Sequence, residues 1–441
     1  MEFWIKAAQL ILSLSILIVL HELGHFLPAR WFGTRVEKFY LFFDAGFSLF
    51  KFKKGETEYG IGWIPLGGYV KISGMIDESM DKEQLEKPAE PWEFRSKPTW
   101  QRLVIMIGGV TVNFILGFFI YILLMFSYGK DYVPPENLTY GISCDSLALA
   151  HGFRDGDMVL EMNGESIDDF MAINGEIMIF NANDFKVRHE NGDVEIIRLP
   201  EDIEYSMMNL GVRDLISPRL PAEIGKVQKE RPAESAGFKV GDKIVSVNGV
   251  STTYWHEFFK EVRNHKEDSV LILIDRNGMS QEISVLTDSL GMIGIERPEF
   301  SKIINVEHRD YSFLAAIPAG ISYGSHKLAM YVNQLKFLFT KKGATSIGGF
   351  GAIGSLFPGT WDWHSFWSLT ALLSFILAFM NILPIPALDG GHVMFLIYEM
   401  IAGKAPSDKF LTRAQVTGMI LLLGLLVYAN GMDIYRYFFG G

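Results

Sequence analysis

Four long apolar stretches constrain the fold of this 441-residue chain more than any other feature. They cover residues 7–29, 103–127, 366–388 and 414–432, and the last three contain no charged residue. A helix needs about 20 mostly apolar residues to cross the hydrocarbon core of a bilayer. With 49% hydrophobic and 21% charged residues, the composition also argues against a disordered chain or an ordinary soluble enzyme. The sequence therefore predicts a polytopic α-helical membrane protein with four transmembrane helices.

The first stretch is interrupted only by His21, Glu22 and His25. A cleaved signal peptide is the alternative interpretation of this segment. However, it lacks a small-x-small cleavage site, and the apolar run continues past the polar residues. The sequence favours a retained signal-anchor helix.

Lysine and arginine near the ends of the spans predict the orientation, because these residues are enriched on the cytoplasmic side. Basic residues lie at both ends of the loop between the first two spans and again before the last span: Arg30, Arg35, Lys38, Arg95, Lys97, Arg102, Lys404, Lys409 and Arg413. With four spans these two loops fall on one side. We expect both to be cytoplasmic, with the termini and the central segment on the outer, periplasmic side of a bacterial inner membrane.

The central segment is a solvated acidic domain. Residues 131–310 contain 33 Asp and Glu against 18 Lys and Arg, whereas the whole chain has a net charge of −11. No Lys/Arg-rich stripe is present, so nucleic acid is not an expected partner. The single cysteine, Cys144, excludes an intrachain disulfide framework and a thiolate-cluster metal site.

The central segment contains an internal repeat with an offset of 85 residues. In each copy a short helix precedes Gly-Phe and Gly-Asp turns, then a strand (158–162 or 243–247) that ends in Asn-Gly. Asn-Gly favours a tight hairpin turn. The pattern resembles bacterial PDZ domains, which implies two α+β domains. Such domains either capture an extended peptide or a C-terminal carboxylate, or here serve only as a size-selecting cover; the sequence leaves both open.

The first span contains the pattern His-Glu-x-x-His at His21, Glu22 and His25. Residues four apart on an α-helix share a face, so both imidazoles can hold one zinc ion. Glu22, one step round the helix, can act as a general base on the attacking water. Chance matches to so short a motif occur, but ionisable residues inside a membrane helix are costly and favour a functional role.

A catalytic zinc usually has three protein ligands, so a third intramembrane ligand is expected. The third span ends in the sequence Asn-Ile-Leu-Pro-Ile-Pro-Ala-Leu-Asp-Gly-Gly-His at residues 381–392. Its prolines prevent regular helical pairing, and irregular backbone at membrane depth must line protein or a watery cavity. Asp389 and His392 are both candidates, and the residues alone do not choose between them.

These elements together resemble the site-2 protease family of intramembrane zinc metalloproteases. The resemblance rests on the His21–His25 motif, the motif at 381–390, the stretch at 64–71 and the tandem repeat, and it covers nearly the whole chain. It implies that one zinc ion is bound by His21, His25 and Asp389, with Glu22 as the catalytic acid and base. It further implies substrate-binding roles for six residues: Gly67, Gly68, Tyr69, Asn381, Pro384 and Pro386.

Residues 56–74 alternate glycines with apolar and aromatic residues, which suits a bent, membrane-associated β-hairpin. A helical substrate must unwind before its peptide bond can be attacked, and an exposed strand edge could pair with the unwound segment. The resemblance implies such a re-entrant β-loop. An ordinary cytoplasmic loop is the alternative.

The expected organisation follows in chain order. We expect the first span and zinc helix (1–30), a cytoplasmic region with the β-loop (31–100), the second span (101–128), two PDZ domains (131–212 and 213–295), a linker with an interfacial helix (296–361), the third span (362–389), a cytoplasmic loop (390–413), the fourth span (414–432) and a tail (433–441).

The expected function is zinc-dependent cleavage of a single-span membrane protein within or near its transmembrane segment. The resemblance implies a substrate first trimmed by an upstream site-1-type protease, with anti-sigma factors or remnant signal peptides as substrate classes and the lipid bilayer as surroundings. A non-proteolytic adaptor with a structural zinc is the main alternative, but structural zinc has four protein ligands and no adjacent base. A zinc transporter is a third, less suited to four spans and one metal site.

Overall fold

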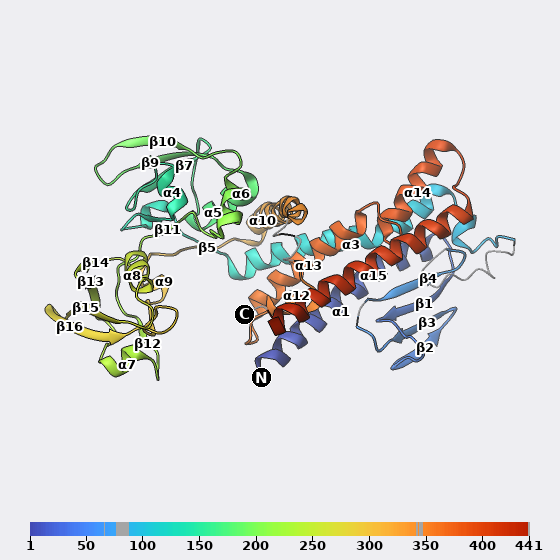
Figure 1. The fold of residues 1–441 in the computed structure, drawn as a ribbon. Helices are drawn as coiled ribbons and strands as arrows, with labels where there is room; N and C mark the ends of the chain where they lie inside the picture. The colour runs from blue at the N-terminus through green and yellow to red at the C-terminus, as the bar shows by residue number, and fades with distance from the viewer. Residues whose placement is uncertain (66, 76–87, 341–342, 344–346, 440–441) are drawn as a thin grey trace. The chain divides into compact units, whose positions relative to one another are not determined.

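The computed structural model describes residues 1–65, 67–75, 88–340, 343 and 347–439 (Figure 1). The chain divides into two compact units. The first combines Met1–Gly129 with Asp310–Gly441, and the second is Lys130–Arg309. The boundaries separate the apolar helices from the acidic central segment that the charge distribution indicates.

Within the first unit, four helices of the described chain are long and apolar enough to cross a membrane. They are α1 (Glu2–Trp31), α3 (Thr99–Tyr128), α13 (Trp363–Ile382) and α15 (Asp408–Phe439). Helices α1, α3 and α15 each contain one predicted stretch, and α13 contains the third stretch, 366–388, only as far as Ile382. The prediction of four helices of spanning length is confirmed.

Helix α3 is the centre of this unit, because α1, α10 (Phe313–Gln334), α13 and α14 (Asp389–Ala402) all pack against it. Its contact with α1 is close at Gly24 and Gly108. A Cβ on either glycine would collide with the backbone of the other. Only glycine therefore lets the two helix backbones meet here, and this contact lies one residue before His25.

A four-stranded sheet follows α1 and replaces the expected hairpin. Its strands are β1 (Val36–Leu41), β2 (Phe50–Lys54), β3 (Thr57–Ile61) and β4 (Tyr69–Ile72), in the order β2-β3-β1-β4. Strands β3 and β4 do not pair with each other, because β1 lies between them, parallel to β3 and antiparallel to β4. The prediction of one β-hairpin over 56–74 is therefore wrong.

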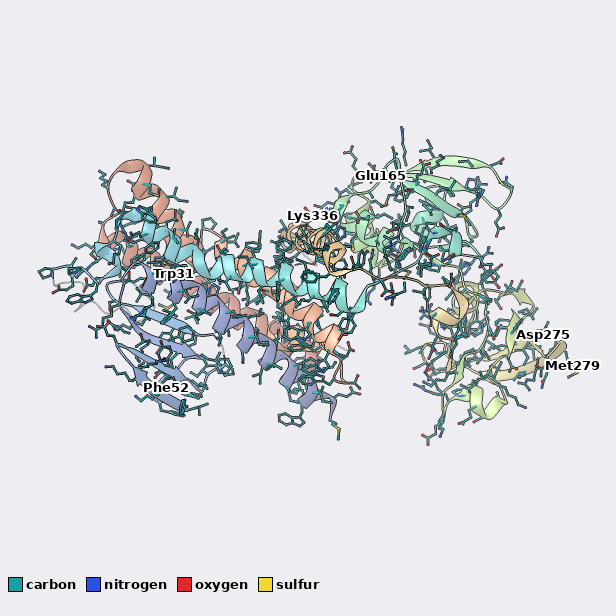
Figure 2. All side chains as sticks on the ribbon, turned by 180° about the vertical axis from the view of Figure 1, so that it is seen from behind. Trp31, Phe52, Glu165, Asp275, Met279 and Lys336 are labelled. Carbon is teal, nitrogen blue, oxygen red and sulfur yellow. The ribbon has the colours of Figure 1, made fainter. Side chains whose placement is uncertain are left out.

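The hairpin prediction failed because it paired neighbours in the sequence. The segment between β3 and β4 makes one isolated bridge, between Phe43 and Ile64, and Pro65 has no N–H to donate. Leu66, part of the predicted stretch, lies outside the described residues. The true hairpin is β2 with β3, and Phe52 lies exposed on its outer edge strand (Figure 2).

Helix α14 (Asp389–Ala402) occupies most of the segment that the sequence analysis assigned to a loop at 390–413. The third apolar stretch, 366–388, therefore is not one helix. Helix α13 stops at Ile382, an irregular segment follows, and a new helix starts at Asp389. Short helical elements fill other connections: η1 (Phe94–Ser96), η4 (Leu335–Phe339) and α12 (Phe350–Ser355).

The second unit contains two four-stranded sheets with the same connectivity. The first sheet has the order β10-β9-β7-β8, and the second sheet has the order β16-β15-β13-β14. Each strand of the second sheet is the repeat of the strand at the same place in the first. Their strands are β7 (Met158–Met162), β8 (Glu165–Ser166), β9 (Asp184–Arg188), β10 (Val194–Arg198), β13 (Lys243–Val247), β14 (Val250–Ser251), β15 (Ser269–Arg276) and β16 (Met279–Leu286). Strands β7 and β13 have the predicted bounds. Asn163 and Asn248 take positive φ angles of 52° and 49°, as the predicted Asn-Gly turns require.

Helices and shorter strands complete the second unit. The helices are η2 (Pro135–Asn137), α4 (Ser146–Ala150), η3 (Phe170–Ala172), α5 (Ile173–Phe180), α6 (Ile203–Leu210), α7 (Pro232–Ala236), α8 (Trp255–Arg263) and α9 (Phe300–Ile303). The strand pairs are β5 (Lys130–Tyr132) with β18 (Glu307–Arg309), β6 (Ile142–Cys144) with β11 (Ile216–Pro218), and β12 (Lys226–Val227) with β17 (Ile295–Glu296).

These pairs move two of the expected boundaries. Because β11 pairs with β6, the first copy continues to Pro218 rather than ending at 212. Because β18 pairs with β5, the compact unit continues to Arg309, into the segment expected to be a linker (296–361). Both strands find partners far away in the sequence, so their place could not be inferred from the local repeat.

Candidate metal centre

Helix α1 places His21 and His25 on one face. Their Nε2 atoms lie 3.3 Å apart, and the two rings meet edge to face with centroids 4.9 Å apart. The helical repeat of 3.6 residues per turn brings residues four apart into this position. The predicted face of the zinc helix is therefore present.

Asp389 reaches the same point from the first residue of α14. Its Oδ2 lies 3.2 Å from Nε2 of His21 and 3.3 Å from Nε2 of His25. The irregular segment after Ile382 turns the chain so that α14 begins here. At Ala387 the backbone takes a φ of 81°, an uncommon conformation for a residue with a Cβ. Glycine at 390 is required as well, because a Cβ there would collide with the backbone of Ile382 and Leu383.

The three donor atoms fit a tetrahedral ion. With metal–ligand distances of about 2.0–2.2 Å, neighbouring ligands of a tetrahedral zinc lie about 3.3–3.6 Å apart. The three observed separations are 3.2–3.3 Å. Asp389 Oδ2 is buried and accepts no hydrogen bond, although two ring nitrogens face it. Such an orphaned carboxylate oxygen between imidazoles is what a site for a cation requires.

Among the described residues, this trio forms the one group of three or more His, Cys, Asp or Glu side chains that could hold a metal ion. His392, the alternative third ligand, is not part of it. It lies one turn further along α14, in the wall of a separate cavity of about 300 Å³ with Arg102 and Glu399. Those two residues are joined by a 2.5 Å hydrogen bond.

Helix α3 supplies the outer contacts of both histidines. Nδ1 of His25 donates to the carbonyl oxygen of Ile105 at 2.8 Å, which leaves its Nε2 lone pair free for a metal. Nδ1 of His21 faces the carboxamide of Asn113, with 3.2 Å to Nδ2. Between them, Gly109 leaves room for both rings.

Asn113 was not among the site residues predicted from the sequence. It is the single carboxamide within the stretch 103–127. A polar side chain in an otherwise apolar span is the signal that could have identified it. Polar groups inside the membrane are costly, so their presence indicates a function.

Glu22 faces the sheet. The backbone N–H of Val70, in β4, faces its carboxylate. A Cβ at Gly68 would lie 2.7 Å from the carbonyl oxygen of Tyr40 and 3.6 Å from Cγ of Glu22. A Cβ there would also lie 2.5 Å from Cγ2 of Ile18, so the glycine lets the chain before β4 approach both the sheet and α1, and β4 itself is an edge strand.

Of the remaining predicted site residues, one lies at the metal centre and three lie in irregular segments. Asn381, in the last turn of α13, has its Nδ2 3.4 Å from Nε2 of His21, so it lies at the metal centre. Pro384 and Pro386 lie in the irregular segment between α13 and α14. Gly67 faces the ring of Phe43.

The side chain of Tyr69 turns away from the metal centre. Its hydroxyl donates to Asp44 at 2.8 Å, and its ring stacks on Tyr40 and Phe43. Burial and the Asp44 carboxylate raise the pKa of this phenol. The side chain of Tyr69 therefore organises the sheet.

Sequence comparisons show which known proteins this chain is similar to. A sequence profile of peptidase family M50 matches residues 9–425. The chain is 30% identical to the regulator of sigma E protease of Haemophilus influenzae, over 99% of this chain and 100% of that protein. It is 29% identical to the regulator of sigma-E protease RseP of Escherichia coli, over 97% and 98%. It is 26% identical to a Vibrio cholerae protein whose name describes a zinc metalloprotease, over 97% of each.

Proposed function

The chain belongs to peptidase family M50, and we propose that it cleaves single-span membrane proteins within or near their transmembrane segments. It is a metalloprotease, and its metal is zinc. The observation that carries the proposal is the convergence of His21, His25 and Asp389, beside Glu22, where α1, a helix long enough to span a bilayer, meets the start of α14.

We assign the zinc ligands as Nε2 of His21, Nε2 of His25 and Oδ2 of Asp389. When bound, zinc polarises the scissile carbonyl and lowers the pKa of water. Three protein donors leave a fourth tetrahedral position, as a catalytic site requires. A structural zinc, which the adaptor alternative needs, would call for a fourth protein ligand.

Glu22 is the proposed general base and acid. Its carboxylate takes a proton from the attacking water, and it returns that proton to the nitrogen of the leaving amine. The N–H of Val70 orients the carboxylate for both transfers. Asn381, within reach of His21, can donate from its carboxamide to the substrate carbonyl.

The sheet supplies the proposed substrate platform. Strand β4 pairs on one side with β1 and lies at the edge of the sheet order. An unwound substrate segment can add to this edge through backbone hydrogen bonds. Gly67, Gly68 and Tyr69 would present this backbone, and Pro384 and Pro386 would keep the opposite segment from forming a helix over the centre.

We further propose a place for this cleavage in a two-step proteolysis. Relatives over the full length are named regulators of sigma E protease. Anti-sigma factors are therefore the first substrate class to test, with remnant signal peptides second, after trimming by an upstream site-1-type protease. The two repeats of the second unit are proposed to be PDZ domains. The basic loops would place the sheet in the cytoplasm and these domains in the periplasm, with the helices in the inner membrane.

The test is cleavage of a single-span substrate with a trimmed outer domain in membranes, by wild type and by Glu22→Gln, with bound zinc measured in both. Glutamine keeps the shape and removes the base, so we expect a loss of at least about 100-fold in cleavage with zinc retained. Glu56→Gln is the matched control, because Glu56 is an exposed residue of the β2–β3 turn. Equal cleavage by wild type and Glu22→Gln would overturn the proposal.

A further inference from the structure

The carboxamide of Asn113 is buried beside a metal ligand with one of its polar atoms unused. The residue has no exposed surface. Its Nδ2 lies 3.2 Å from Nδ1 of His21, while its Oδ1 is buried without a hydrogen-bond partner. Leaving a buried carbonyl oxygen unpaired costs about 1–3 kcal/mol. This arrangement therefore calls for an explanation.

The position of the proton on the ring of His21 explains why the Oδ1 atom of Asn113 has no partner. Its Nε2 faces Asp389 and His25, so this nitrogen must carry the lone pair when His21 is a ligand, and Nδ1 must carry the proton. His25 already has this tautomer, with Nδ1–H donated to Ile105. An N–H of His21 would then face the NH₂ of Asn113, and two donors cannot form a hydrogen bond.

A rotation of the carboxamide by 180° resolves the conflict. It exchanges two groups of nearly the same shape, so the packing is unchanged. It brings Oδ1, the unused acceptor, against the Nδ1–H of His21. A metal-bound histidine almost always donates its other N–H to such an acceptor, which orients the ring and raises its basicity.

We propose that Asn113 is a positioning residue for the zinc centre, whose Oδ1 accepts a hydrogen bond from Nδ1–H of His21. The inference rests on the proposed role of His21 as a zinc ligand. Helix α3 then orients both histidines, His25 through the Ile105 carbonyl and His21 through the Asn113 side chain. Helix α13 also fixes the position of Asn113, because Ser374 Oγ donates a hydrogen bond to the backbone oxygen of Asn113 at 2.8 Å.

Two substitutions separate an acceptor role from a donor role. Asn113→Leu has a similar shape and no polar atom, and loss of an outer-shell acceptor typically weakens metal affinity 10–100-fold. Asn113→Asp keeps acceptor oxygens and has no N–H. We therefore expect zinc affinity of the full chain in detergent, measured by competition with a chelator, to fall about 10–100-fold in Asn113→Leu and to stay within about threefold of wild type, or rise, in Asn113→Asp.

Thermal melting of the same zinc-free proteins controls for folding, and Thr370→Val is the matched control. Thr370 is a buried polar residue on α13 whose hydroxyl bonds to Ser13, outside the metal centre. We expect it to lose stability with unchanged zinc affinity. If Asn113→Leu does not fold, Asn113→Ala takes its place with the same expectations.

The outcomes distinguish this inference from the ligand assignment. Wild-type affinity in Asn113→Leu, or an equal loss in Asn113→Leu and Asn113→Asp, overturns the acceptor role. His21→Ala is measured alongside. If it binds zinc as wild type does, the assignment of His21 fails. If it loses zinc while Asn113→Leu does not, the assignment stands and only the role of Asn113 is wrong.

Discussion

Substitution of Gly109 by alanine should damage the metal centre directly. Gly109 lies on α3, opposite the two histidines. A Cβ at this position would lie 2.6 Å from Cε1 and 2.9 Å from Nδ1 of His21, and closer still to Nε2 of His25. Ordinary van der Waals contact begins at 3.4 Å, so the ring of His21 must retreat by about 0.8 Å.

A shift of this size is large on the scale of metal coordination. Ligand distances in a metal site are held to within about 0.2 Å, and a misplacement of about 1 Å in an active site can cost roughly 100-fold in rate. We therefore expect Gly109→Ala to lower zinc affinity at least about tenfold, and cleavage of a single-span substrate by about 100-fold.

Gly117→Ala is the matched control on the same helix. A Cβ there would lie 2.6 Å from Cδ1 of Phe375, a clash of the same size against a ring that binds no metal. Overpacking costs about 1–3 kcal/mol in either variant, offset in part by the roughly 0.5–1 kcal/mol that alanine gains over glycine in a helix. Both should lose similar thermal stability. If chelator competition finds equal zinc affinity in the two variants, the argument from ring displacement is refuted.

Three further predictions concern the second unit and the metal. Hydrogen bonds to Asp157 and Glu195 raise the pKa of His189. The stability that this histidine contributes is therefore complete below its unfolded pKa of about 6.5, and it is lost as the pH rises through the folded pKa. His189→Gln should therefore destabilise the unit more at acid than at alkaline pH, which hydrogen exchange in β7 measures. Asp242→Asn breaks the ion pair between the buried Asp242 carboxylate and the partly exposed Arg276, with bonds of 2.7 and 2.6 Å. The substitution should cost about 1.5–3 kcal/mol in the unfolding of this unit, the range for hydrogen bonds to a charged group; unchanged exchange in β13 would contradict this. Chelation of zinc should lower the melting temperature of the first unit, and added zinc should restore it.

Local patterns in the sequence predicted those parts of the structure that depend on near neighbours. The spacing of His21 and His25 was sufficient to place both on one helical face, because helical geometry is the same in any context. Strands β7 and β13 were found at their observed bounds because Asn-Gly turns mark where each ends. Four helices of spanning length followed from apolar length alone.

Long-range pairing limited the rest. Nothing local indicates that β1 enters between β3 and β4, or that β11 returns to pair with β6. The choice between Asp389 and His392 stayed open for the same reason. It depends on the turn at Ala387 and on where α14 begins, which the surrounding helices determine.

The most direct test of the zinc centre compares Asp389→Ala with His392→Ala. The two residues lie one turn apart on α14, and only Asp389 faces the histidines. The measurement is zinc bound per chain in purified protein, with substrate cleavage recorded on the same samples. We expect Asp389→Ala to lose zinc and cleavage together, and His392→Ala to keep its zinc. Full zinc occupancy in Asp389→Ala, or loss of zinc in His392→Ala alone, would contradict it.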